Sequence, residues 1–230
     1  MGVFPADGQR GCENQQKQIA MFENRKDAGK KLAGALEKYA DENALVLAIP
    51  RGGVEPALEV AGHLNAEFSL IISRKLPYPD NPEAGFGAVA ENGSTFIING
   101  ATGWLSSSEI DIIKNEQIQE IERRIKVLRK GRPLPDIEGR TVILIDDGLA
   151  MGSTMRAALL MCRKQDPEKI IAAVPVAGRD VAKQMKSEAD ELIVLESPPF
   201  FRAVAQVYRN WYDVSDQEVL DLIHDWEKTH

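Results

Sequence analysis

The chain has 230 residues, of which 43% are hydrophobic and 27% charged, and its 28 Lys and Arg against 35 Asp and Glu give a net charge of −7 with neutral histidines. This composition is typical of a globular domain that buries its own core, and it excludes a disordered or fibrous chain. Nucleic-acid binding relies on Lys and Arg, and base stacking relies on aromatic side chains. The acidic balance and the 6% aromatic content therefore predict no nucleic-acid partner, whereas a small anionic ligand needs only a local positive site.

Residues 1–20 are polar and lack periodic apolar positions, which predicts a flexible extension ahead of one folded domain at 21–230. The sequence contains no apolar signal segment and no stretch of about 18 apolar residues, so we expect no membrane partner and a cytoplasmic location. The two cysteines, Cys12 and Cys162, make no disulfide framework, which agrees with a reducing compartment.

Helix-like and strand-like segments alternate along the chain. The first is an amphipathic helix that begins near Asn24 and places Ala28, Leu32, Leu36 and Tyr39 on one face. Apolar runs typical of strands covered on both faces follow at 44–49, 68–72, 95–98, 141–145, 170–176 and 192–195. Helical patterns occur at 56–64, 108–130, 153–164, 180–188 and 215–226. The alternation predicts an α/β fold with a mostly parallel sheet, helices on both faces, and ligand-binding loops at the carboxyl ends of the strands.

One connection interrupts this alternation. Residues 74–93 contain three Pro and three Gly in 20 positions. Loops of that length without regular structure are usually functional or disordered. We expect this segment to be a mobile cover over the active site.

The most informative motif follows the strand at 141–145. The strand ends in the acidic pair Asp146 and Asp147, and the next residues form a turn that opens a helix: Gly148, Leu149, Ala150, Met151, Gly152, Ser153 and Thr154. Backbone N–H groups, hydroxyls and the positive end of the helix can bind a phosphate there. The carboxylates can accept hydrogen bonds from vicinal hydroxyls or hold a magnesium shell. The motif therefore predicts a ribose 5-phosphate ligand. It is not a Walker motif, because no Lys follows Gly152.

Two further segments carry cations at strand ends. The strand at 44–49 is followed by Arg51, Gly52 and Gly53, and the glycines permit backbone conformations closed to other residues. The strand at 68–72 is followed by Arg74 and Lys75. We expect the three cations to converge on one cleft opposite the acidic pair, although a charged, solvated strand end would also explain Arg74 and Lys75.

The stretch VILIDDGLAMGSTMRAA resembles the 5-phosphoribosyl 1-diphosphate (PRPP) binding signature of the type I phosphoribosyltransferases. The segments PRGGVEPALEVA, ISRKLPYPDNPEAGFGAVAENG and SPPFFRAVAQVY are also similar to that family, so the resemblance extends from Met21 to Trp226. One departure is Met151, where the family usually has Thr. The resemblance implies a Rossmann-like α/β fold with a small hood.

The resemblance also implies an activity: Mg²⁺-dependent transfer of ribose 5-phosphate from PRPP to an unidentified acceptor, with a nucleobase as one candidate, and release of pyrophosphate. By family position, the catalytic residues are Arg51, Lys75, Asp146 and Asp147, and the two aspartates also hold the metal. The implied substrate-binding set is Arg51, Gly52, Gly53, Arg74, Lys75 and residues 146–154.

Three questions stay open on the sequence alone. Some members of this family are regulators, so a PRPP- or nucleotide-sensing protein with little or no catalysis is the alternative function. Residues 197–212 are the candidate hood, in which Phe200 or Phe201 either stacks on a planar acceptor or merely leads into the next helix. Members of the family are often dimeric, so a homodimer is compatible with the resemblance.

Overall fold

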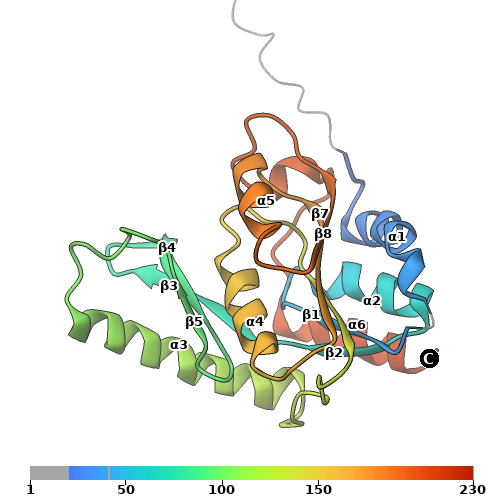
Figure 1. Cartoon of the computed structure of the whole chain (residues 1–230), viewed down its shortest axis with the longest axis horizontal. Coiled ribbons are helices and arrows are strands. Elements are labelled where there is room, and N and C mark those ends of the chain that lie inside the picture. The colour runs from blue at the N-terminus through green and yellow to red at the C-terminus, as the bar shows by residue number, and fades with distance from the viewer. Residues whose placement is uncertain (1–20, 41, 230) are drawn as a thin grey trace, which may run out of the picture.

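The computed structural model describes residues 21–40 and 42–229, so the predicted extension at 1–20 lies outside the described residues. Its centre is a five-stranded, all-parallel sheet in the order β2-β1-β6-β7-β8 (Figure 1). The strands are β1 (Ala44–Ala48), β2 (Glu67–Leu70), β6 (Thr141–Ile145), β7 (Lys169–Val176) and β8 (Glu191–Glu196). Strands β1, β6 and most of β7 are buried on both faces, which explains their continuous apolar runs. The predicted α/β fold with a parallel sheet is confirmed.

Helices cover both faces of this sheet (Figure 1). One face packs against α1 (Arg25–Ala35), α2 (Val54–Leu64) and α6 (Asp216–Glu227), and the other against α4 (Ser153–Arg163) and α5 (Arg179–Met185). Alternation along β1 shows the division, because Val46 belongs to the first core and Leu45 to the second. Short 3-10 helices follow α1 and β8 at η1 (Glu37–Tyr39) and η2 (Val204–Val207).

The expectation of a mobile loop at 74–93 is wrong. This segment forms most of a three-stranded antiparallel sheet, with β3 (Ser73–Tyr78), β4 (Asn81–Ala90) and β5 (Thr95–Ile97) in the order β3-β4-β5. The predicted strand at 95–98 belongs to this second sheet. Its strands and the long helix α3 (Ser107–Leu128) project together to one side of the main sheet (Figure 1).

Packing explains why the proline and glycine content misled the prediction. Leu76 and Phe86 are fully buried and belong to the same core as Val46 of β1, so the hairpin is held by packing on the main body of the protein. A Cβ on Gly87 would lie 2.2 Å from the carbonyl oxygen of Phe96, so this glycine permits a close strand approach. Pro77 sits at a register shift between β3 and β4, where a missing N–H is tolerated.

No helix in the described part of the chain is both long enough and apolar enough to span a membrane.

Candidate functional site

Two glycine-containing turns meet at the carboxyl ends of β1 and β6. A Cβ on Gly52 would lie 1.9 Å from the carboxylate Oδ2 of Asp147, and one on Gly53 would lie 2.6 Å from the carbonyl oxygen of Ile145. Any larger side chain would therefore push the two turns apart. The structure brings Gly52 and Gly53 directly against the acidic pair, whereas the side chain of Arg51 reaches Asp216 at the start of α6.

The two carboxylates of the acidic pair differ in their surroundings. Asp147 is buried, and its Oδ2 accepts a hydrogen bond from Nε of Arg25 at 2.9 Å. Its backbone carbonyl accepts a hydrogen bond from the Tyr208 hydroxyl at 2.8 Å. Asp146 is partly exposed, and its Oδ1 accepts the backbone N–H of Asp147 at 2.9 Å. Asp147 is therefore committed to an internal ion pair, whereas the carboxylate of Asp146 makes no ion pair among the described residues.

Burial and mutual repulsion set the protonation of this pair. Burial, and then the charge of Asp147, raise the pKa of Asp146 well above its usual range. Burial also raises the pKa of Asp147, but the guanidinium of Arg25 opposes this shift. The carboxylate beside Arg25 is thus the one that is more readily ionised, and a cation entering the site would favour ionisation of Asp146.

Arg25 is a functional residue that sequence reasoning missed. It begins α1, its Nη1 donates to the carbonyl oxygen of Tyr212 at 3.0 Å, and its guanidinium lies 3.9 Å from the centre of the Trp211 ring. The guanidinium of Arg25 therefore connects α1 with the acidic pair and with the segment before α6. A signal was present in the sequence, since Arg25 precedes Ala28 and Leu32 at helical spacing and shares their buried face.

The turn at 148–154 lines a cavity of about 480 Å³ together with the second sheet. Gly152 has φ 71° and caps α4, so the first N–H groups of that helix have no partner within it. Lys75 and Tyr78 line the cavity from β3. The cavity thus combines backbone donors, a helix N-terminus and Lys75, which suit an anionic group, and Glu83 also lines it.

Sequence reasoning also missed Arg156, which hydrogen-bonds to the turn at 148–154 from within α4. It is buried within α4, and its Nη1 donates to the carbonyl oxygen of Met151 at 2.8 Å. Its Nε lies 2.7 Å from Oε2 of Glu188, and its guanidinium lies 4.9 Å from the centre of the Phe96 ring in β5. These contacts tie the turn to α4, to Glu188 and to β5. A charged residue inside the apolar pattern MRAALLMC was the available signal.

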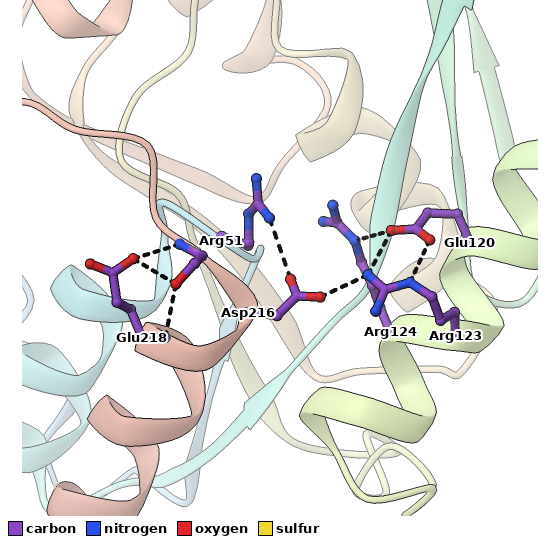
Figure 2. Close-up of polar contacts among 7 residues, drawn as sticks. Arg51, Glu120, Arg123, Arg124, Asp216 and Glu218 are labelled. Atoms are coloured by element: carbon purple, nitrogen blue, oxygen red, sulfur yellow. Dashed lines mark hydrogen bonds and ion pairs between the residues drawn. The ribbon is translucent and has the colours of Figure 1, made fainter.

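The expected convergence of three cations on one cleft is not what the structure shows. Successive side chains of a strand point to opposite faces. Lys75 lines the cavity and donates from Nζ to the carbonyl oxygen of Glu83 at 2.7 Å, whereas Arg74 donates from Nε to Gln117 of α3 at 3.1 Å. Nη1 of Arg51 lies 3.4 Å from Oδ1 of Asp216 in α6 (Figure 2). Lys75 therefore lies on the side of the turn at 148–154, and Arg74 lies on the side of α3.

The residues of the candidate hood, 197–212, also differ in their surroundings. Val204 lines the cavity beside residues 148–154, and Phe201 packs with it in a small cluster that includes Trp211. The side chain of Phe200 is 90% exposed. The structure thus gives Phe201 a packing role and leaves Phe200 free to meet solvent or a ligand.

The family model and the curated relatives point to one family. The family model described as phosphoribosyl transferase domain matches residues 15–210. A Mycobacterium tuberculosis H37Rv protein named "Putative phosphoribosyl transferase Rv0571c" is 36% identical over 209 residues, which cover 89% of this chain and 47% of that protein. The chain therefore spans about half the length of the curated relatives it matches. The crystal structure of TT1426 from Thermus thermophilus is 35% identical, with a TM-score of 0.74, and the match covers 89% of this chain and 98% of that one.

Proposed function

The chain belongs to the phosphoribosyl transferase domain family, and on that premise we propose that it transfers ribose 5-phosphate from PRPP to an acceptor and releases pyrophosphate. The observation that carries this proposal is the direct connection of the acidic pair to a helix-capping glycine turn, with the Arg51 turn packed against the same pair. Phosphate, diol and diphosphate would then have adjacent partners at one edge of the sheet.

In this proposal the turn at 148–154 binds the 5-phosphate. Ser153 and Thr154 lie in the first turn of α4 and would add hydroxyl donors to the backbone N–H groups. Lys75 would add positive charge from the opposite side of the cavity. Met151 lacks a hydroxyl, so the backbone donors would carry more of the binding at that position.

Asp146 is the residue best placed to accept the ribose hydroxyls. Mg²⁺ is commonly held by one or two carboxylates, with substrate oxygens completing its shell. Among the described residues, no group of three or more His, Cys, Asp or Glu could hold a metal alone. The partly exposed Asp146 fits the first pattern, and Asp147 would support it through the ion pair with Arg25. Mg²⁺ bound there would withdraw charge from the diphosphate.

The chemistry needs orientation and charge stabilisation more than proton transfer. As an acceptor atom bonds to C1 of the ribose, the bond from C1 to the diphosphate oxygen breaks and the electron pair leaves with pyrophosphate. A proton on the acceptor atom would pass to solvent or to the released pyrophosphate. Arg51 would stabilise the charge that grows on this leaving group. Asp146 would hold the sugar in line, and the sheet β3-β4-β5 over the cavity would limit access of water.

Calorimetric titration with PRPP and Mg²⁺ tests the proposal. Asp146→Asn should weaken binding by about tenfold or more, because a neutral amide replaces a charged acceptor. The matched control is Asp221→Asn, which changes an exposed aspartate on α6 and should bind as the wild type does. Equal binding by the wild type and Asp146→Asn would contradict the proposed role of the acidic pair.

A PRPP- or nucleotide-sensing protein remains the second candidate, and Met151 favours it. The side chain is 57% exposed on the very turn that would bind the 5-phosphate. Pyrophosphate release, measured with PRPP and a panel of nucleobases, separates the two functions. Turnover with any base supports the transferase, whereas tight binding without turnover supports the sensor.

A further inference from the structure

A groove of about 280 Å³ lies at the edge of the main sheet and shares no lining residue with the cavity beside the turn at 148–154. Three parts of the chain line it: the edge strand β2, the end of α3 with the residues that follow it, and α6 (Figure 1). Its apolar walls include Phe68, Leu70, Leu128, Ile223 and Trp226. The volume lies just below the range of about 300–1,000 Å³ that is typical of small-molecule sites. The groove therefore suits a single ring or a short chain.

Arg129 is the buried charge of this groove. Its side chain is 7% exposed, and its Nη1 donates to the carbonyl oxygen of Leu70 at 3.0 Å and to Oε1 of Glu91 at 2.9 Å. The same Oε1 of Glu91 accepts the backbone N–H of Ile72 at 3.2 Å. The guanidinium is thus held in place by β2, by the start of β3 and by Glu91 before any ligand arrives, which lowers the entropy cost of binding.

One edge of this guanidinium is unused. Nη2 of Arg129 pairs with Glu91, and Nε is buried without a hydrogen-bond partner among the described residues. A guanidinium can bind a carboxylate through two neighbouring nitrogens, and Nε with Nη2 is such a pair. Buried polar groups are normally hydrogen-bonded. The unused edge of Arg129 therefore marks a position for an oxygen acceptor from outside the described chain.

The charges around the groove favour a monoanion. The exposed side chains of Lys130 and Arg132 also line it, and neither makes an ion pair within the described ranges. The negative groups of the lining are Glu67, which is ion-paired elsewhere, and Glu227. Positive charge at the end of α3 would by itself explain Lys130 and Arg132, but the guanidinium of Arg129 turns to Glu91 instead. A single carboxylate matches this balance, because two acidic side chains would repel a more highly charged ligand.

We infer that this groove binds a small carboxylate with an apolar body, which places its two oxygens on Nε and Nη2 of Arg129 and its body against Phe68 and Ile223. The ligand would part the side chains that cover Nε and give this nitrogen the acceptor it lacks. Its body would remove apolar surface of β2 and α6 from water. The inference does not depend on the proposed function, because no residue of the proposed transferase site lines the groove.

Two-dimensional NMR of the ¹⁵N-labelled full chain, titrated with benzoate, 3-phenylpropionate and hexanoate, tests the inference. At least one of these carboxylates should shift the resonances of β2 and of residues 129–132 in a saturable way. The neutral 3-phenylpropanamide is the matched probe for 3-phenylpropionate. It should bind about tenfold more weakly or not at all, because it lacks the charge that pairs with the guanidinium.

Three variants locate the ligand, with unfolding curves to show that each is folded. Arg129→Lys keeps a charge for Glu91 but loses the edge formed by Nε and Nη2, so carboxylate binding should weaken about tenfold or more. The exposed double variant Lys130→Gln, Arg132→Gln should weaken it about two- to fivefold. Lys186→Gln removes an exposed lysine at the end of α5, outside the groove, and should bind as the wild type does.

Four outcomes would overturn the inference. They are binding of none of the three carboxylates, equal binding of the acid and its amide, shifts confined to other parts of the chain, and unchanged binding by a folded Arg129→Lys. If Arg129→Lys does not fold, unchanged binding by the double variant overturns the inference, and weaker binding supports it. Binding that requires Arg129 and tolerates Lys186→Gln is the expected result.

Discussion

The turn at 148–154 and the contacts of Arg51 are built in different ways. The turn lies at a helix N-terminus, and the buried Arg156 donates a hydrogen bond to the carbonyl of Met151 within it. Arg51 comes from the turn after β1 and Arg123 from α3, and both partly exposed side chains reach the carboxylate of Asp216. The comparison teaches that the end of the proposed site at the turn is fixed by packing, whereas the end at Arg51 is made of partly exposed side chains.

The largest expected effect concerns the ion pair that supports the fixed end. Arg25→Gln leaves the buried carboxylate of Asp147 without its partner, which should lower the free energy of unfolding by about 3–5 kcal/mol. Urea denaturation measures this loss. The double variant Arg25→Gln, Asp147→Asn should recover part of it, because no charge is then left unpaired. A loss below about 1 kcal/mol in the single variant would show that the fixed end does not depend on this pair.

Gly52→Ala tests the contact between the two turns. The added Cβ would lie 1.9 Å from Oδ2 of Asp147. Overpacking of this kind lowers the free energy of unfolding by about 1–3 kcal/mol. We expect that loss in the free energy of unfolding, together with weaker PRPP binding in calorimetry. Gly34→Ala is the matched control, since a Cβ added there would have no neighbour within 4 Å and alanine favours a helix. Unchanged stability in Gly52→Ala would break the proposed connection.

The pH dependence of PRPP binding tests Asp146 itself. Its pKa is raised by burial and by Asp147, and it must be ionised to accept the ribose hydroxyls or Mg²⁺. Affinity should therefore fall as the pH is lowered, and it should do so above the range of an ordinary aspartate, about 3.9. Comparing the wild type with Asp146→Asn at each pH removes the titration of the ligand. Parallel pH profiles for the two proteins would argue against this role.

Ionic strength should give the smallest difference in binding between the two ends of the proposed site, the Arg51 end and the turn at 148–154. Arg51 and Arg123 have side chains 36% and 48% exposed, so their charges are open to screening. Pyrophosphate binding should weaken a few-fold more than ribose 5-phosphate binding when ionic strength rises from about 0.05 to 0.5 M. Calorimetry of both ligands in the same buffers measures the difference. An equal loss would mean that the two ends do not differ in the way proposed.

Sequence reasoning succeeded where the signal was local. The strand at 141–145 was predicted with its observed bounds, and the helix after the glycine turn begins at Ser153 as expected. It failed at 74–93, where prolines and glycines were taken as marks of a loop, although Gly87 allows a close strand approach and Pro77 lies at a register shift that tolerates it. Composition alone cannot distinguish a glycine that allows flexibility from one that allows close packing.

By itself, the sequence determined the α/β architecture and the motif in which an acidic pair leads into a glycine turn, because strand, turn and helix are consecutive and their propensities are local. Only the tertiary structure decided which side chains complete the site. Arg25 lies 122 positions from Asp147 along the chain, and Arg51 lies 165 positions from Asp216. Such pairs depend on how helices pack on the sheet and on which face of a strand each side chain takes. For the same reason Arg74 and Lys75, adjacent in sequence, make different contacts: Arg74 donates to Gln117 of α3, whereas Lys75 lines the cavity beside the turn.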